Sequence, residues 1–210
     1  MKKLDNKGLS LVELVIAISM ATIVIGAATM FLYSAQKSYR NAEYSIDLQM
    51  EAQLLMEQMS NWVMESNYID YGGASGSNYL VLYSIPRPDV DPSTLDAVPK
   101  CGERKIIYLY GTKLYIKIDA ESTPGTFVKE IEDKTLDPTT FLGVTPPEEN
   151  CIGEYTQLFT VSLPPSVKPE SINSVIIELG LKEGTSAMSQ SYSVTNRFSL
   201  RNGMAQIENE

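Results

Sequence analysis

Apolar side chains are concentrated in one long run near the N-terminus. The chain carries no formal charge from Leu14 to Gln36, and most of this run is apolar. At a rise of about 1.5 Å per residue, roughly 20 such residues cross the ~30 Å hydrocarbon core of a bilayer as a helix. Three lysines precede the run, and basic residues stay on the cytoplasmic side. The pattern therefore predicts a single-pass helix, residues 9–36, with its N-terminus in the cytoplasm.

Beyond Lys37 the pattern becomes amphipathic. Apolar residues recur at alternating steps of four and three, with acidic and amide residues between them: Leu48, Ala52, Leu55, Met59 and Trp62. This spacing predicts a second helical stretch, residues 37–67, that lays one stripe against a core. A continuous helix over residues 9–67 would be nearly 90 Å long at the same rise. Such a helix is too long for one small domain, so its first half is expected to lie outside the globular part.

Residues 68–210 carry the signals of an antiparallel sheet. The clearest is a hairpin whose arms, residues 104–110 and 113–118, flank Gly111-Thr112. Other expected strands are residues 79–85, 155–163, 173–181 and 191–200, with a short edge strand at 126–132. The proline-bearing segments 86–100 and 135–150 are expected to be loops. The predicted fold class is α+β, with a long N-terminal helix packed on an antiparallel β-sheet domain.

Glu13 does not fit a plain membrane anchor. It stands at the entrance of the apolar run, where an unpaired carboxylate costs several kcal/mol, so a charge at this position suggests a functional partner. An ordinary signal anchor would explain the length and the lysines but not Glu13. A cleaved secretory signal would need a cut near Gly26-Ala27-Ala28, yet the apolar run continues past it.

A short basic leader, then Gly8, then Glu13 at the head of an apolar helix resemble the class III signal of type IV pilins and pseudopilins. In that family a prepilin peptidase cuts after the glycine, here between Gly8 and Leu9, and methylates the new amine. The glutamate, here Glu13, then pairs with the N-terminal amine, here of Leu9, of a neighbouring subunit. Most family members carry Phe where this chain has Leu9. The resemblance implies a leader (1–8), a transmembrane and filament-core helix (9–36), an amphipathic helix (37–67) and a globular domain (68–210).

Composition restricts the chemistry of the globular domain. The sequence has no histidine, which excludes a Ser-His-Asp triad, a Cys-His pair and histidine metal ligation. The net charge of −9 argues against non-specific binding of nucleic acid. No phosphate loop or nucleophile motif is present, so neither an enzyme activity nor a cofactor or metal is expected. Cys101 and Cys151, the two cysteines, are a candidate disulfide in an exported domain, with two free thiols as the alternative.

A segment near the C-terminus carries a second, weaker resemblance to the pilin family. Residues 198–202, Phe-Ser-Leu-Arg-Asn, are similar to the end of the J-type and W-type minor pilins. The combined resemblance implies a minor pilin or pseudopilin that helps initiate or cap a filament of a pilus, type II secretion or DNA-uptake machine. Its partners would be other pilin subunits, the prepilin peptidase, an assembly platform and, before assembly, the lipid bilayer of the inner membrane. The alternatives are an adhesin at a filament tip, binding through loops 86–103 and 133–154, and a signal-anchored exported enzyme.

Overall fold

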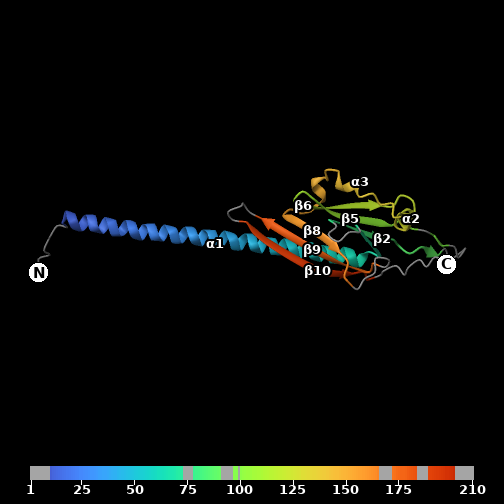
Figure 1. The fold of residues 1–210 in the computed structure, drawn as a ribbon, viewed down its shortest axis with the longest axis horizontal. Helices are drawn as coiled ribbons and strands as arrows, with labels where there is room; N and C mark the ends of the chain where they lie inside the picture. The colour runs from blue at the N-terminus through green and yellow to red at the C-terminus, as the bar shows by residue number, and fades with distance from the viewer. Residues whose placement is uncertain are drawn as a thin grey trace, which may run out of the picture. The chain divides into compact units, whose positions relative to one another are not determined.

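The computed structural model describes residues 10–72, 78–90, 97–98, 100–165, 172–183 and 189–201 (Figure 1). By its internal contacts the chain divides into two compact units, Met1–Tyr44 and Ser45–Glu210, which are described separately below. A single helix, α1 (Leu11–Glu65), supplies the described helix of the first unit and the first element of the second. The predicted α+β class and the predicted long helix are both confirmed.

The second unit contains two main antiparallel sheets. The larger has the order β1-β2-β5-β6-β7, and the smaller has the order β10-β9-β8. Their bounds are β1 Tyr68–Tyr71, β2 Tyr79–Ser84, β5 Glu103–Tyr110, β6 Lys113–Ala120, β7 Cys151–Gly153, β8 Thr156–Ser162, β9 Ser174–Glu183 and β10 Gln190–Ser199. Two-residue strands β3 (Asp89–Val90) and β4 (Ala97–Val98) pair separately. The predicted hairpin is β5–β6, where Gly111 takes the positive φ of 65° that a tight two-residue turn requires.

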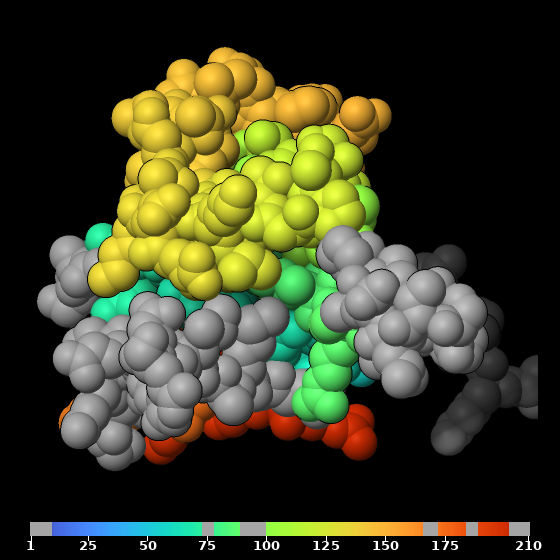
Figure 2. Space-filling model, turned by 90° about the vertical axis from the view of Figure 1, so that its right-hand side faces the viewer, coloured from blue at the N-terminus to red at the C-terminus, as the bar shows by residue number. Residues whose placement is uncertain are grey.

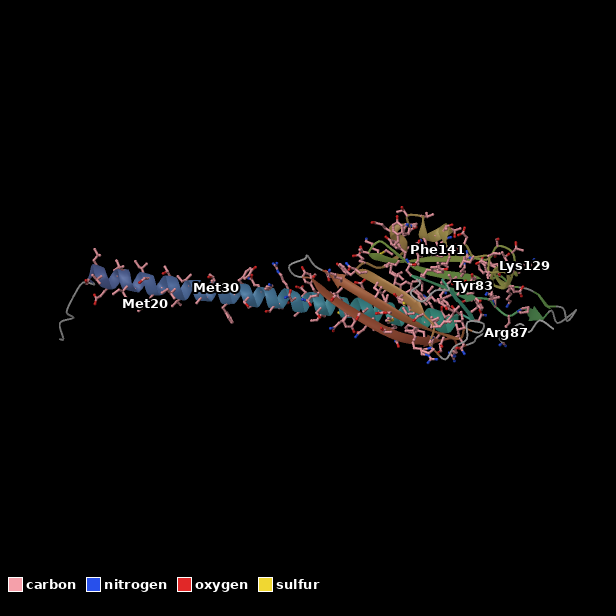
Figure 3. The ribbon with its side chains drawn as sticks, viewed as in Figure 1. Met20, Met30, Tyr83, Arg87, Lys129 and Phe141 are labelled. Carbon is pink, nitrogen blue, oxygen red and sulfur yellow. The ribbon has the colours of Figure 1, made fainter. Side chains whose placement is uncertain are left out.

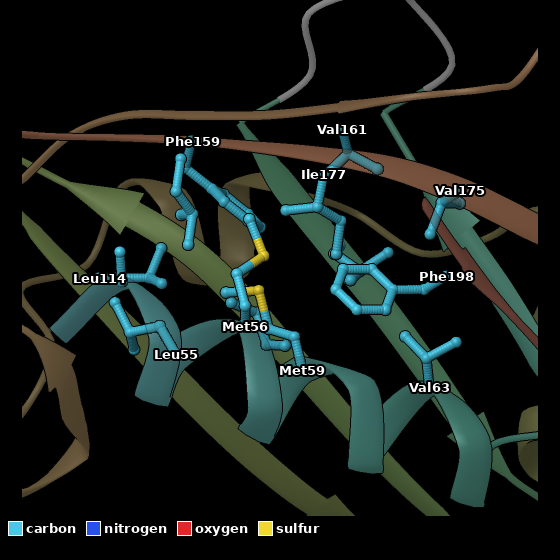
Figure 4. Close-up of a cluster of buried hydrophobic side chains, with 14 of the residues drawn as sticks. Leu55, Met56, Met59, Val63, Leu114, Phe159, Val161, Val175, Ile177 and Phe198 are labelled. Carbon is cyan, nitrogen blue, oxygen red and sulfur yellow. The ribbon is translucent and has the colours of Figure 1, made fainter. Parts of the chain in front are cut away.

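The main core encloses the C-terminal stripe of α1. The buried residues of this stripe are Leu48, Ala52, Leu55, Met56, Met59 and Val63, which include most of the apolar positions that the periodicity selects. They pack against the inner faces of both sheets, including Leu80, Ile107 and Leu114 of the larger sheet and Phe159, Ile177 and Phe198 of the smaller. Figure 4 shows Met56 directed toward Phe159, and Phe198 lying over Val63. Both sheets therefore contribute to one core that buries a single stripe of the helix.

A second apolar cluster covers the opposite face of the larger sheet. Two short helices, α2 (Thr126–Asp133) and α3 (Thr139–Leu142), place Phe127 and Phe141 over the sheet residues Val81, Tyr83, Ile106, Tyr108 and Tyr115. In Figure 2 this α2–α3 segment is the raised yellow and orange region beside the yellow-green hairpin. The larger sheet therefore has apolar cover on both faces.

Helix α2 corrects the sequence-based prediction of an edge strand at residues 126–132. Phe127 and Ile131 stand four residues apart, so a helix places both on the face that packs into the second cluster. Lys134 ends the helix with a left-handed backbone, φ 50°, and donates its amide to the Glu130 carbonyl. The predicted loop at 135–150 likewise contains α3 and a 3-10 turn, η1 (Glu148–Asn150).

A carboxylate of α1 fixes the turn that joins the two sheets. Glu51 Oε1 accepts the backbone amides of Glu154, at 2.8 Å, and of Tyr155, at 3.4 Å, in the turn between β7 and β8. Gly153 precedes this turn, and a Cβ at Gly153 would lie 2.9 Å from Leu55 Cδ1 and 3.3 Å from the same Glu51 oxygen. Glycine therefore allows the helix to approach closely enough for Glu51 to bind the turn. Burial raises the pKa of Glu51 above its ordinary value of 4.5.

Two methionines on α1 provide a matched test of the core. Met59 is fully buried, whereas Met50 is 64% exposed on the same helix. We expect Met59→Ala to lower the free energy of unfolding by about 2–5 kcal/mol, because it leaves a cavity in the main core. Met50→Ala is expected to change it by less than about 0.5 kcal/mol. Denaturant unfolding of the full chain in mild detergent, followed by fluorescence of Trp62, measures both. Equal losses would contradict the placement of this stripe.

Glu51 gives a prediction for the pH dependence of stability. Glu51→Ala leaves two amides without an acceptor and is expected to cost about 1–3 kcal/mol, whereas Glu51→Gln keeps an acceptor oxygen. Because the pKa of Glu51 is higher in the folded state, its stabilising contribution is present at acid pH and is lost as the pH rises from about 4.5 through that raised pKa. Glu51→Gln should therefore gain stability relative to the wild type over this range. A pH-independent difference between the two unfolding free energies would refute this.

Candidate functional site

The described chain begins at the residue that caps helix α1. Ser10 is the last residue before the helix, and its carbonyl accepts the first helical hydrogen bond, from the Leu14 amide at 3.1 Å. The Ser10 amide donates to Glu13 Oε2 at 3.0 Å. This is the glutamate half of a capping box, in which a side chain of the first turn binds the amide of the cap residue. The predicted processing residues Gly8 and Leu9 lie outside the described residues.

The spacing of Ser10 and Glu13 is a sequence signal for this contact that charge alone does not reveal. Ser10-Leu11-Val12-Glu13 has the serine-to-glutamate spacing of a capping box immediately before an apolar run. The structure thus gives Glu13 a partner within its own chain. The second oxygen of this carboxylate has no partner within the part of the chain that the structure describes.

The first unit presents apolar side chains on all sides of its helix. Every residue from Leu11 to Tyr33 is exposed, and the side chains of Met20 and Met30 lie on the surface of the helix (Figure 3). Over its most apolar 18-residue window the mean hydropathy is 2.3, so this helix is long and apolar enough to cross a membrane. The hydroxyls of Ser19, Thr22 and Thr29 donate to earlier helix carbonyls at 2.8–3.0 Å. Each of these hydroxyl groups therefore has a hydrogen-bond acceptor within the helix and does not need a water molecule as its partner.

The tyrosines of the β5–β6 hairpin serve the sheet rather than an open binding platform. Tyr108 and Tyr115 are buried and stack with their ring centroids 6.2 Å apart. The ring of Phe141 from α3 lies 5.5 Å from that of Tyr108. Tyr110 packs edge-on against Tyr115, with centroids 6.3 Å apart. These aromatic side chains therefore belong to the apolar cluster on this face of the sheet.

An ionic network joins α2 to the larger sheet. Arg104 of β5 donates to Asp119 Oδ2 at 2.7 Å and to Glu130 of α2, and its guanidinium lies 5.1 Å from the centre of the Phe127 ring. The hydroxyl of Tyr83 donates to the same Glu130 oxygen at 2.7 Å. Burial, together with Glu130, raises the pKa of Tyr83 well above its ordinary value. Since each charge has an opposite charge as a partner, this cluster is suited to holding α2 in place.

The candidate disulfide between Cys101 and Cys151 is not formed in the structure; both residues are free thiols, which is the alternative that the sequence left open. Strand register explains why. Cys151 lies opposite Tyr115 of β6, whereas Cys101 precedes β5 at the Ala120 end of the hairpin. Five residues of β6 separate these positions, about 16 Å at the rise of an extended strand. A disulfide requires Cα atoms within about 7 Å.

A shallow hollow of about 430 Å³ lies beside Cys101 at the end of the larger sheet. Its lining residues are Glu65, Asn67, Ser84, Ile85, Pro86, Cys101, Gly102, Glu103 and Ala120. Several of its polar groups are already bonded: Asn67 binds the backbone of Ile85, and the Gly102 amide donates to the buried Glu121 at 2.7 Å. Among the described residues, no group of three or more His, Cys, Asp or Glu could hold a metal ion. The two carboxylates of the lining, Glu65 and Glu103, both pair with Lys105.

Comparison with known proteins yields no relative: no model of a protein family, no curated protein and no solved structure matches the chain. The function must therefore be inferred from the residues and geometry given above.

The two cysteines should differ in reactivity. Cys101 is exposed, whereas Cys151 is half-buried and its pKa is raised by burial, which lowers the thiolate fraction. With no reductant present, we expect maleimide to label both thiols, Cys101 at least about tenfold faster. Cys101→Ser and Cys151→Ser assign the two phases by intact mass. A wild-type chain that takes up label only after reduction would instead support the disulfide.

Proposed function

We propose that the chain is a minor pilin or pseudopilin, a non-enzymatic subunit that helps initiate or cap a type IV pilus-like filament. The observation that carries the proposal is the single uninterrupted helix α1. Its first part is exposed and apolar with Glu13 in its first turn, and its last turns bury a stripe in a folded domain. A helix with both properties suits a subunit that stays in a membrane until other subunits enclose it.

In this proposal, the apolar part of α1 lies first in the lipid bilayer and later among the helices of other subunits. Leu11 to Tyr33 expose large apolar side chains, which water does not favour. Before assembly the bilayer would enclose them, with the N-terminus in the cytoplasm and the sheet domain on the outer side of the inner membrane. After extraction by an assembly platform, helices of neighbouring subunits would replace the lipid. The hydroxyls already bonded within the helix tolerate both environments.

In this proposal, Glu13 determines how neighbouring subunits align in the filament. After cleavage between Gly8 and Leu9, the amine of Leu9 on an adjoining subunit would neutralise the carboxylate. Pairing offsets the cost of removing a charge from water and sets the axial register between subunits. The partners are then other pilin-like subunits and the prepilin peptidase. The resemblance of residues 198–202 to J-type and W-type minor pilins favours a low-copy role over that of a repeating subunit.

The test is intact-mass and N-terminal analysis of the chain produced with an active prepilin peptidase. We expect loss of residues 1–8 and a methylated Leu9 at the new N-terminus. Gly8→Val and cells without the peptidase serve as controls that should keep the leader. An uncut chain beside active peptidase would indicate a plain membrane anchor. A cut near Ala28 would indicate a secreted domain, and the filament proposal would fall.

A further inference from the structure

Strand β10 is an open edge of the smaller sheet. Its ten residues pair with β9 without a bulge, and no described strand lies on its other side. Natural edge strands are usually short, bulged or protected by proline or lysine, because their unpaired backbone groups can bind another strand. β10 contains neither proline nor lysine. An edge of this length is therefore expected to be covered.

The side chains of β10 indicate what kind of strand fits beside it. Phe198 is 7% exposed and belongs to the main core, whereas the next residue, Arg197, is exposed. The Arg197 guanidinium donates to the Ser174 hydroxyl at 3.2 Å and has no carboxylate partner within the described part of the chain. Because side chains alternate between the two faces, an added strand needs an apolar residue beside Phe198 and an acidic one beside Arg197.

The hydrogen bonds at the end of β10 show which residues face the open edge. The Leu200 amide donates to the Asn173 carbonyl, just before β9, at 2.8 Å. Alternate residues of an antiparallel strand bond to the same neighbour, so the backbone groups of Arg201 and of Arg197 face the open edge. In agreement, the Arg197 amide donates to the Asn196 side chain at 2.9 Å.

We propose that residues 204–208 of the same chain cover this edge as an added antiparallel strand. These residues lie outside the described residues. Asn202-Gly203 directly follows Arg201, and Asn-Gly is a preferred pair for a two-residue hairpin turn. Such a turn hydrogen-bonds the residues on either side of it, so it requires Arg201 to face the open edge, as it does.

The turn fixes a register that pairs complementary side chains. Counting outward from the turn, Ile207 lies opposite Phe198, where it extends the main core. Glu208 lies opposite Arg197 on the other face and supplies the missing carboxylate. A shift of one residue would instead place Glu208 opposite Phe198. The turn, the apolar pair and the charged pair therefore all select the same register.

Covering β10 has a consequence for contacts between molecules. An uncovered β10 offers its backbone to a strand of any neighbouring molecule, whereas a covered β10 leaves such contacts to other surfaces. The added strand is therefore an internal barrier to edge-to-edge association. It does not depend on the proposed function, because it uses residues of one chain only.

Engineered disulfides test the register. Leu200→Cys with Ala205→Cys joins a pair that is not hydrogen-bonded, the kind in which the side chains lie closest. Leu200→Cys with Gln206→Cys is the matched control, because it closes a loop of nearly the same length but position 206 points to the opposite face. Both are made with Cys101→Ser and Cys151→Ser. We expect mild oxidation to close the first pair at least about tenfold faster, within one chain.

Two outcomes of the oxidation would overturn the proposal. Equal rates for the two pairs would do so, because an unpaired C-terminal segment brings both pairs together equally often. Disulfide-linked dimers of the first pair, detected by non-reducing electrophoresis, would place the strand that covers β10 on a second copy of the chain.

Amide hydrogen exchange by NMR, in detergent micelles, provides a second test. The Ser199 amide faces the open edge within the covered part, whereas the Ser193 amide faces the same edge beyond it. Removal of residues 202–210 should speed exchange at Ser199 roughly fivefold, as the loss of one hydrogen bond implies, and leave Ser193 unchanged. Gly203→Val should act similarly, because a β-branched residue resists the positive φ of this turn. Unchanged exchange at Ser199 in the shortened chain would refute the proposal.

Discussion

The structure of the second unit depends on the burial of one stripe of helix α1. Leu48, Leu55, Met59 and Val63 are almost completely inaccessible to solvent, and no single sheet surrounds them. Residues of both sheets pack against this stripe. Each fully buried aliphatic side chain of this size contributes about 1.5–3 kcal/mol, so the stripe is a main source of stability. The Glu51 contact then fixes the turn at which the chain passes from one sheet to the other.

The larger sheet has a further requirement, because its outer face is also apolar and aromatic. This face must be covered from water, and helices α2 and α3 cover it by placing Phe127 and Phe141 over the tyrosines. Arg104 connects α2 to the sheet through Glu130 and Asp119, so that a short segment with little apolar area of its own remains attached. This explains why a chain with a net charge of −9 places one of its few arginines in a half-buried position.

The sequence predicted those elements whose pattern of apolar and polar residues extends over many positions. Helix α1 and the β5–β6 hairpin follow from repeats that extend over many residues, and tertiary packing reinforces them. Strands β1 and β7, of four and three residues, were not predicted, because so few residues cannot establish an alternating pattern. The predicted strand at residues 126–132 is wrong because Phe127 and Ile131 suit a helix equally well. The sequence left the state of the two cysteines open for a different reason, since cysteine number says nothing about strand register.

Two glutamates of α1 show how much of the candidate site could be predicted. Both carboxylates accept backbone amides, but Glu51 binds a turn that is more than a hundred residues away in sequence, which no local pattern reveals. Glu13 binds an amide three residues away, at a spacing that is visible in the sequence. Glu51 has two amide partners within the fold, so its role is complete inside the chain. Glu13 has one amide partner among the described residues, in its own helical turn, so the contact that the sequence reveals is a local one.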